Sequence, residues 1–544
     1  MTIYSYVSGG FDGDLVTVEV DLRRGIPGMD VVGLPDNAVR EARERVRAAV
    51  RNSGFHVPRE RILINLAPAG VKKAGASFDL PIAAALLLAD GQIQAETGLR
   101  ILIIGELELS GTLRPVNGVL AAVASAVQAG IDFYLVPREN AYEAFTVGAD
   151  KVLTIGHLRE ISRIFSLLIH RRRDLLVNDV REDVNGKNLL MNNAGGDEHG
   201  LDLLVNEVRG DENGRDENPG SQGNDYADIL GQGHLKRACE IAAAGRHHML
   251  LFGPPGVGKT MAAMRFMSIL PPLRREEAIE VTRIYSIGGM LPKGSGLIRN
   301  PPLRAPHHTA SREGLIGGGS QIQPGEISYA HRGVLFLDEA FEFSFNLLQS
   351  LREPLERGIV EIARSGMHYW FPARFQLIMA VNPCPCGKLG KPGAVCMCTP
   401  IEIHRYWKKL GAALLDRIDL RVPVEHQGPI LDNRKKVSSS RDMSERIERA
   451  IAAQDERCKQ HGLRNADMAT AELKRCCPLS AKAADGLRKA VEQIGLSTRA
   501  EYSVIKIART IADLDGSEVI LPDHLLEAVH FRRYTEGDYF WNAA

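Results

Sequence analysis

The stretch GPPGVGKT, residues 253–260, constrains the fold of this 544-residue chain more than any other feature. It has the P-loop spacing Gly-x-x-x-x-Gly-Lys-Thr. The apolar run HMLLF (248–252) before it predicts a buried strand. The following TMAAMRFMSIL (260–270) predicts a helix that ends at two prolines. A strand, a glycine-rich turn and a helix in this order are typical of an α/β fold that binds phosphate groups at a helix N-terminus.

Each part of the motif has a physical role in holding a nucleotide. Glycines let backbone N–H groups close around phosphate oxygens. Lys259 is expected to neutralise the β- and γ-phosphates, and the Thr260 hydroxyl to bind Mg²⁺. A glycine-rich turn with an accidental Lys-Thr is the alternative, which the flanking strand and helix disfavour. The expected nucleotide-binding residues are Gly253, Pro254, Pro255, Gly256, Val257, Gly258, Lys259 and Thr260.

A second acidic motif follows about 80 residues later. The segment RGVLFLDEA (332–340) predicts an apolar strand that ends in Asp338 and Glu339. A carboxylate at the end of such a strand suits a Mg²⁺ ion shared with Thr260. The adjacent Glu339 is placed to activate the attacking water. Strands often end in acidic residues by chance, but the combination with a P-loop predicts an ATP hydrolase.

Composition limits the other function classes. The chain has 67 basic and 67 acidic residues, a net charge of +0, so no global positive field indicates nucleic acid. A local basic element remains compatible with DNA binding. The N-terminus has neither a basic region nor an apolar signal segment, and no uncharged run approaches the ~18 residues of a membrane span. These features predict a cytoplasmic protein without a membrane partner.

Changes of pattern along the chain predict an α/β multidomain protein. We expect an α/β domain over 1–172, an acidic flexible linker over 173–224, an α/β nucleotide-binding core over 225–432 and a helical C-terminal domain over 433–544. In the first domain the expected strands are 15–22, 61–68, 99–111 and 131–137. The expected helices are 36–54, capped by Asp36, then 79–91 and 119–130. In the last domain they are 446–462 and 500–516.

Three further segments make the central region resemble the AAA+ ATPases. The strand LIMAVNPC (377–384) places Asn382 at the sensor-1 position of that superfamily. The segment LGAALLDRIDL (410–420) matches the one that carries the arginine finger, which is Arg417 here. GLSTRAEYSVIKIARTIADL (495–514) matches the lid segment with the sensor-2 arginine, Arg499. The alternative for each arginine is a surface ion pair. An arginine finger implies a homo-oligomeric ring, by resemblance a hexamer.

Longer stretches resemble a narrower family. Residues 304–339 and 347–387 are similar to the magnesium-chelatase branch, and within it to the YifB/ComM-type competence proteins. That family begins with a domain of ribosomal-S5-like fold that is similar to the Lon protease domain. The loop PAGVKKAGASFDLP (68–81) then places Ser77 at Lon's nucleophile position. Lon's lysine base is replaced by Leu120, so we expect a protease fold without protease chemistry.

Four cysteines gather in NPCPCGKLGKPGAVCMCTP (382–400). Cys384-x-Cys386 and Cys396-x-Cys398 offer two thiolate pairs that can close a tetrahedral, structural Zn²⁺ site. The C-x-C spacing is tighter than usual, and four reduced thiols in an ordered loop are the alternative. The other four cysteines fall in helical patterns, where we expect them to pack in the core.

The segment EIARSGMHYWFPARF (361–375) predicts two short strands around a turn. In related ring helicases this hairpin points a basic residue into the pore, and Arg364 occupies the matching position. Tyr369 and Trp370 either stack on bases or pack the hairpin itself.

The resemblance implies a ring-forming, ATP- and Mg²⁺-dependent helicase that binds single-stranded or branched DNA. Its task would be branch migration of recombination intermediates in natural transformation. The alternatives are a magnesium-chelatase- or MoxR-like ATPase that remodels protein substrates, and an ATP-switched scaffold without translocation.

Overall fold

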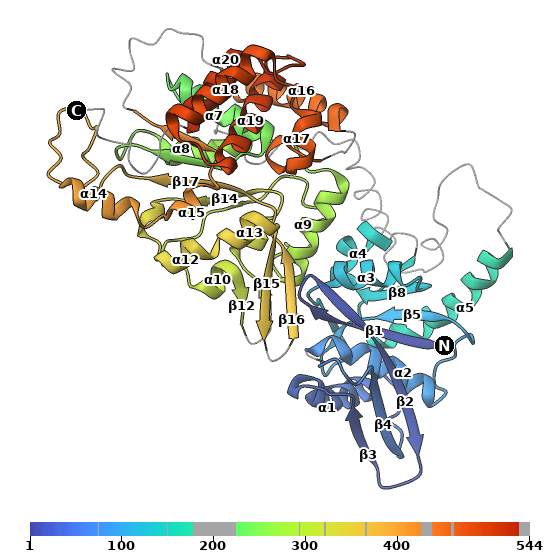
Figure 1. Cartoon of the computed structure of the whole chain (residues 1–544). Coiled ribbons are helices and arrows are strands. Elements are labelled where there is room, and N and C mark those ends of the chain that lie inside the picture. The colour runs from blue at the N-terminus through green and yellow to red at the C-terminus, as the bar shows by residue number, and fades with distance from the viewer. Residues whose placement is uncertain are drawn as a thin grey trace. The chain divides into compact units, whose positions relative to one another are not determined.

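The computed structural model describes residues 1–73, 75–148, 151–177, 225–292, 294–319, 322–364, 367–425, 438–458 and 462–532. It forms two compact units (Figure 1). Unit 1 contains the described residues of Met1–Asp216, Ala278–Ile298 and Ala363–Trp370. Unit 2 contains those of Glu217–Glu277, Arg299–Ile362 and Phe371–Ala544. Most of the expected linker lies outside the described residues, although a helix of unit 1 continues to Val177, beyond the expected linker start.

Unit 1 is built on a seven-stranded mixed sheet with the order β3-β4-β2-β1-β5-β8-β9. The strands are β1 (Thr2–Gly9), β2 (Asp12–Arg23), β3 (Gly28–Val32), β4 (Arg61–Ala67), β5 (Arg100–Ile103), β8 (Phe133–Pro137) and β9 (Val152–Ile155). The expected strand 99–111 is instead β5 followed by the small hairpin β6 (Glu106–Leu107) and β7 (Leu113–Arg114). The strand ends at Ile103 because the backbone of Gly105 bonds elsewhere: its N–H donates to the Ser77 carbonyl, and its carbonyl accepts from the Leu80 N–H.

The helices of unit 1 include the three expected ones and two more, over 141–148 and 161–177, that were not expected. They are α1 (Asn37–Asn52), α2 (Asp79–Ala89), α3 (Val119–Gln128), α4 (Ala141–Gly148) and α5 (Ile161–Val177). The expected cap of α1 is confirmed, because the Asp36 side chain accepts a hydrogen bond from the Val39 N–H. Gly54, at φ +88°, follows the end of the helix. Five of its apolar side chains are buried on one face.

The serine loop leads directly into α2. Ser77 lies in a short 3₁₀ turn, Ala76–Phe78, and its carbonyl accepts a hydrogen bond from the Gly105 N–H. Leu120, at the place of Lon's lysine, is fully buried near the start of α3. Lys73 is also buried and donates to the Pro68 carbonyl within the same loop. The lack of protease chemistry stays a prediction.

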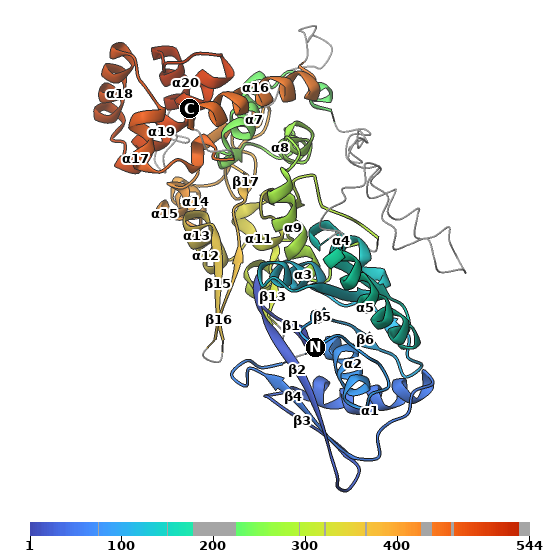
Figure 2. The ribbon, with the colours of Figure 1, turned by 90° about the vertical axis from the view of Figure 1, so that its right-hand side faces the viewer.

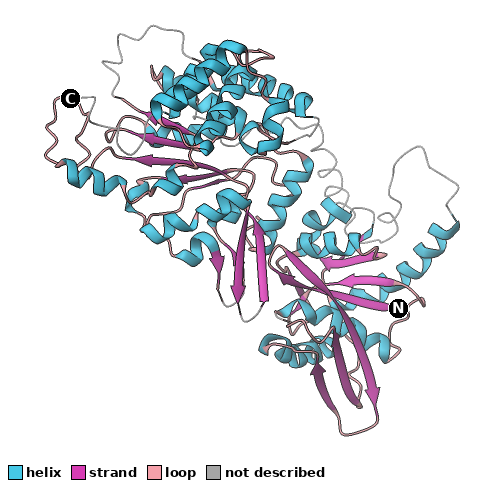
Figure 3. Ribbon diagram, viewed as in Figure 1, coloured by secondary structure: helices cyan, strands magenta, loops and turns pink. Residues whose placement is uncertain are grey.

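Unit 2 contains a five-stranded parallel sheet with the order β11-β14-β17-β10-β18. Its strands are β11 (Leu303–Arg304), β14 (Val334–Leu337), β17 (Gln376–Val381), β10 (Met249–Phe252) and β18 (Leu420–Pro423). The helices and short strands that connect them are α7 (Gly233–Gly245), α8 (Lys259–Arg265), α9 (Arg275–Ile287, which continues into unit 1), α10 (Arg312–Ile316), β12 (Gly317–Gly318), β13 (Gln323–Pro324), α11 (Glu326–Tyr329), α12 (Phe345–Ser350), α13 (Arg352–Arg357), α14 (Pro400–Trp407) and α15 (Ala412–Leu415). Figure 3 shows helices on both sides of this sheet.

Both faces of the parallel sheet are covered by apolar cores. Alternate strand residues enter one core, namely Met249, Leu251, Val334, Phe336, Ile378 and Ala380. Their neighbours enter the other, namely Leu250, Phe252, Leu335, Leu337, Leu377 and Met379. Burial on both faces explains why these strands are continuous apolar runs in the sequence.

The C-terminal helices share the first of these cores. They are α16 (Ser440–Cys458), α17 (Thr470–Cys476), α18 (Ala481–Ile494), α19 (Thr498–Leu514) and α20 (Pro522–Arg532), drawn in orange and red in Figure 2. A polar network also ties α19 to the sheet. His247 lies 3.0 Å from an Asp419 carboxylate oxygen and 2.8 Å from the Thr510 hydroxyl. Cys239, Cys458, Cys476 and Cys477 are all buried, as expected.

The strands β15 (Ile359–Arg364) and β16 (Met367–Pro372) form the expected two-stranded hairpin. Ser365 and Gly366 of its turn lie outside the described residues. Across the described parts of the chain, every helix is too short or too polar to cross a membrane.

Glu277 gathers several arginines in unit 2. Its side chain is 6% exposed, and one carboxylate oxygen lies 3.0 Å from Arg246 and 3.3 Å from Arg332. The other accepts a hydrogen bond from the Arg274 N–H. Burial acts to raise the pKa of Glu277, but Arg246 and Arg332 outweigh it and lower the pKa to about 2.

Glu277→Gln is expected to lower the free energy of unfolding by about 3 kcal/mol at pH 7, because it leaves buried arginines without their counter-charge. A lowered folded-state pKa stabilises above the unfolded pKa, so the difference from wild type should shrink as the pH falls from about 5 towards 2. Urea unfolding at several pH values measures this. Glu276→Gln, on the exposed neighbour, is the control and should change stability by less than about 0.5 kcal/mol. Equal effects of the two substitutions would contradict the assignment.

Candidate functional site

The P-loop connects β10 to α8. Gly256 and Gly258 have φ values of +84° and +96°, which only glycine adopts readily. The Lys259 amine donates to the carbonyls of Gly253 (2.6 Å) and Pro254 (2.9 Å). These bonds fold the lysine back over the loop, where a phosphate would otherwise accept its protons.

Residues from two other strands meet this lysine and its neighbour. The Asn382 side-chain oxygen lies 3.2 Å from the Lys259 amine. The Thr260 hydroxyl donates to an Asp338 carboxylate oxygen at 2.8 Å. A hydroxyl and a carboxylate oxygen this close fit a shared Mg²⁺ ion, which binds both atom types. The structure thus brings together Lys259, Thr260, Asp338 and Asn382.

Glu339 is exposed beside this cluster. Its backbone is left-handed, with φ +47°, and its N–H donates to an Asp338 carboxylate oxygen at 2.9 Å. A left-handed non-glycine residue is costly and is often retained at functional sites. The Glu339 side chain is exposed and therefore accessible to solvent or a substrate.

Burial lowers the pKa of Lys259 to about 8, and the negative charges of Asp338 and Glu339 only partly oppose that effect. A triphosphate would add negative charge next to the amine and would raise the pKa again. Binding of an anion would therefore stabilise the charged form of Lys259.

Parallel strand direction explains why these residues meet. Gly253 follows β10, Asp338 follows β14 and Asn382 follows β17, and the three strands are adjacent in the sheet. Their carboxyl ends form one edge, where ligands of open α/β sheets bind.

Arg417 and Arg499 lie away from the P-loop and the acidic residues. Both line a cavity of about 770 Å³ in unit 2. One Glu356 carboxylate accepts from Arg417 at 2.5 Å and lies 3.6 Å from Arg499. These ion pairs lower the pKa of Glu356, with the Arg417 hydrogen bond as the largest cause. The structure therefore places the two arginines together, on one shared counter-charge.

This cavity lies at the amino edge of the sheet. It is lined by His248, Gly333 and Gln376, which precede or begin β10, β14 and β17. From His248 to Gly253 the chain advances roughly 16 Å along the strand direction. The cavity lining includes no residue of 253–260. The P-loop and the two arginines thus lie at opposite edges of one sheet.

Glu356 is a residue that the sequence analysis did not single out. It lies in a stretch already noted for its resemblance, but an acidic residue in a helix gives no signal of its own. Arg417 also donates to the Ala413 carbonyl at 2.6 Å, while its buried Nε has no hydrogen-bond partner among the described residues. The guanidinium therefore retains a free donor.

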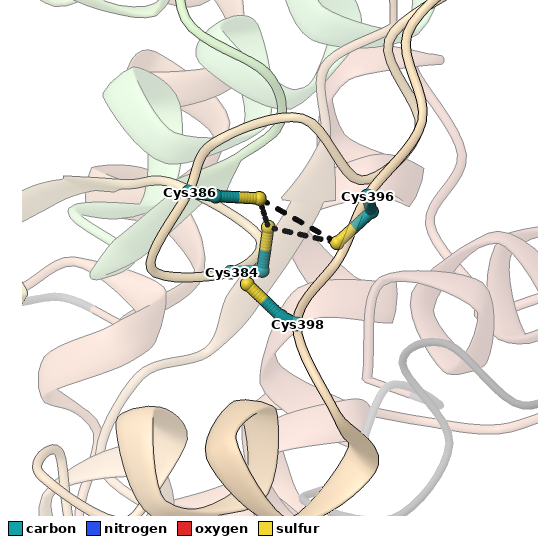
Figure 4. A group of neighbouring side chains, drawn as sticks. All are labelled: Cys384, Cys386, Cys396 and Cys398. Atoms are coloured by element: carbon teal, nitrogen blue, oxygen red, sulfur yellow. Dashed lines mark hydrogen bonds between the residues drawn. The ribbon is translucent and has the colours of Figure 1, made fainter.

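The four clustered cysteines come together at the loop after β17 (Figure 4). Their sulfur atoms all lie within 4.8 Å of one another. The measured Sγ–Sγ distances are 3.4 Å for Cys384–Cys386 and 3.6 Å from each of these to Cys396. A tetrahedral Zn²⁺ with Zn–S bonds of about 2.3 Å needs sulfur atoms about 3.8 Å apart. The donor set and its spacing fit that ion.

The local backbone favours the thiolate form at one ligand. The Lys388 N–H is the largest cause that lowers the pKa of the Cys386 thiol to about 6. Sequence spacing pointed to this cluster, and the structure brings all four sulfur atoms together.

Arg364 is exposed at the end of β15, and Met367 and His368 are exposed at the start of β16. Within unit 1, the Trp370 carbonyl accepts from the Phe11 N–H, and the two rings lie 5.2 Å apart. Trp370 therefore packs against protein, whereas Arg364 faces solvent.

Three family models cover most of the chain. The model described as "Magnesium chelatase, subunit ChlI" matches residues 225–430. "Subunit ChlI of Mg-chelatase" matches residues 18–140, and "Magnesium chelatase, subunit ChlI C-terminal" matches residues 437–532.

Similar proteins extend this match over the full length. "Competence protein ComM" of Haemophilus influenzae is 38% identical, and the match covers 97% of each chain. YifB of Salmonella typhimurium is 37% identical, over 97% of this chain and 96% of its own. The "Magnesium-chelatase 38 kDa subunit" of Rhodobacter capsulatus is 25% identical, over 55% of this chain and 84% of its own. The chain therefore belongs to the YifB/ComM family, whose ATPase region is of the magnesium-chelatase-like AAA+ type.

Proposed function

We propose that this protein is a ring-forming ATPase, most simply a hexamer, whose active sites are completed between neighbouring subunits. The observation that carries this is the separation of the P-loop and the two arginines to opposite edges of one sheet. A head-to-tail ring brings the amino edge of one copy against the carboxyl edge of the next.

Each residue then has a defined role. Lys259 binds the β- and γ-phosphates, and Thr260 and Asp338 hold Mg²⁺. The ion would neutralise charge on the phosphate oxygens. Glu339 accepts a proton from the attacking water. Asn382 orients that water or the γ-phosphate.

Arg417 and Arg499, from the adjoining copy, stabilise the charge that develops during phosphoryl transfer. In the isolated chain Glu356 forms an ion pair with both arginines. A bound triphosphate would compete with this carboxylate for them.

Mixing two inactive variants tests the shared site. Lys259→Ala removes phosphate binding, and Arg417→Ala is expected to lower ATP turnover by about 10³-fold. In rings assembled from equal amounts of both, about a quarter of the interfaces pair an intact P-loop with an intact arginine. Turnover should therefore recover to about a quarter of wild type.

The same mixture with Arg499→Ala shows where that arginine acts. Recovery is expected if Arg499 reaches the neighbour's nucleotide. Absence of recovery would mean that it serves its own subunit, in conflict with its place at the amino edge. Absence of recovery with Arg417→Ala would contradict the shared site itself. Size-exclusion chromatography checks that the rings form.

We further propose that the ring uses ATP hydrolysis to move along single-stranded or branched DNA. Arg364 supports this, because it is an exposed cation at the end of a hairpin whose acidic residue, Glu361, is already paired with Arg357. The name of the H. influenzae relative associates that protein with competence. Branch migration of recombination intermediates during natural transformation is the task we propose for this chain. The proposed compartment is the cytoplasm, where DNA and ATP are both present.

Arg364→Ala is expected to leave ATP turnover without DNA unchanged and to reduce its stimulation by forked DNA at least severalfold, because a phosphate contact is lost. Arg364→Lys, which keeps the charge, should retain most of the stimulation. Arg441→Ala, at an 88% exposed arginine side chain on α16, is the control. Wild-type turnover that does not respond to DNA would instead favour the alternative function, a magnesium-chelatase-like ATPase that remodels protein substrates.

The cysteine cluster is proposed to hold one structural Zn²⁺, because four thiolates leave no position open for a substrate. Metal analysis of the purified protein should find one zinc per chain. Cys386→Ser combined with Cys398→Ser should reduce the zinc content to near zero. Met397→Ala, at an 82% exposed residue between two ligands, should keep it. A zinc-free wild-type protein would exclude the site.

A further inference from the structure

The loop that carries the four cysteines, residues 383–398, is called the cysteine loop, and its first residue adjoins the nucleotide site. It begins directly after Asn382, whose side chain contacts Lys259. The next carbonyl, that of Pro383, accepts a hydrogen bond from the Trp407 indole N–H at 3.0 Å. At the other end, Thr399 and Glu402 form a capping box that starts α14. Both ends of the loop are therefore fixed.

The loop also rests on the prolines of the P-loop. A Cβ atom at Gly387 would lie 3.3 Å from Pro255, and one at Gly390 would lie 4.0 Å from Pro254. Both glycines have φ values near +70°, so the close approach uses backbone that other residues adopt poorly. The cysteine loop thus lies against the turn that must wrap the phosphates.

Trp407 makes a second connection. Its ring lies 6.1 Å from Phe252, the residue before the P-loop, and 5.1 Å from Phe341, just after the acidic pair. The same indole holds the first carbonyl of the cysteine loop. The loop, the P-loop and the acidic motif therefore meet around one buried tryptophan.

Between its fixed ends, this loop has few buried side chains to keep it in place. Residues 384–398 contain no helix or strand, and most of their side chains are exposed. Cys384 is fully buried, whereas Cys386, Cys396 and Cys398 approach it from the exposed part. An ion bound by all four sulfur atoms would close this loop and would offset the conformational entropy that is lost when the loop is ordered.

We propose that metal binding at this cluster and nucleotide binding at the P-loop are positively coupled, so that the metal sets the affinity for ATP. This inference rests on the zinc site proposed above. The bound metal fixes the loop against Pro254 and Pro255 and fixes the position of Asn382. By linkage, nucleotide must then hold the metal more tightly by the same factor.

The coupling is measured in both directions on the full chain. Zinc-loaded and chelator-stripped protein are titrated with a fluorescent, non-hydrolysable ATP analogue and Mg²⁺. We expect about tenfold weaker binding without zinc, a typical size for coupled sites. Conversely, competition with a chromophoric chelator should show about tenfold tighter zinc binding when the analogue is present. No change in either titration, or weaker binding of one ligand in the presence of the other, would overturn the proposal.

The coupling factor of single variants identifies the contact responsible. Pro255→Ala removes the proline on which the loop rests but no metal ligand, so zinc should stay bound while the coupling factor falls towards one. Met397→Ala should keep both the zinc and the coupling. An unchanged factor in Pro255→Ala would exclude this contact. Circular dichroism of the stripped protein must match that of the loaded protein, because a global loss of structure would also overturn the proposal.

These measurements contain neither DNA nor turnover. A protein that fails to move on DNA, or that forms no ring, leaves their outcome unaffected. Failure of the motor proposal and failure of the coupling are therefore separate results.

Discussion

The direction of the parallel strands in unit 2 is the constraint on which the rest depends. It gathers Gly253, Asp338 and Asn382 at one edge of the sheet, although they are far apart in the sequence. The same strands begin beside the cavity that holds Arg417 and Arg499. The P-loop and the two arginines therefore lie at opposite edges of the same sheet.

At both edges, the cationic side chains contact polar groups of their own subunit. Lys259 donates to its own loop carbonyls, and Arg417 and Arg499 share Glu356. These contacts limit the cost of burying cations. A triphosphate bound between two subunits would replace the loop carbonyls at Lys259 and the Glu356 carboxylate at the two arginines. The contacts seen in the single chain therefore suit a site that assembles together with its substrate.

The cysteine loop adds a support that lies outside the motif itself. It joins the end of β17 to α14 and packs on the two prolines of the P-loop. In the N-terminal unit, Ser77 lies in a short 3₁₀ turn and its carbonyl accepts from the Gly105 N–H, and Leu120 is buried near the start of α3. The absence of protease chemistry there stays a prediction. In both the cysteine loop and the serine loop, the role of the local residues depends on the segments that pack against them.

The sequence alone determined the P-loop, the acidic strand end, the Asp36 cap and the four-cysteine spacing, because each depends on residues close together in the chain. Its apolar runs also predicted β10, β14 and β17, since strands buried on both faces need such runs. It could not show that Glu356 joins the two arginines, or that Gly387 rests on Pro255. Those contacts join segments about 60 to 140 residues apart, so they exist only once the sheet and its connections have folded.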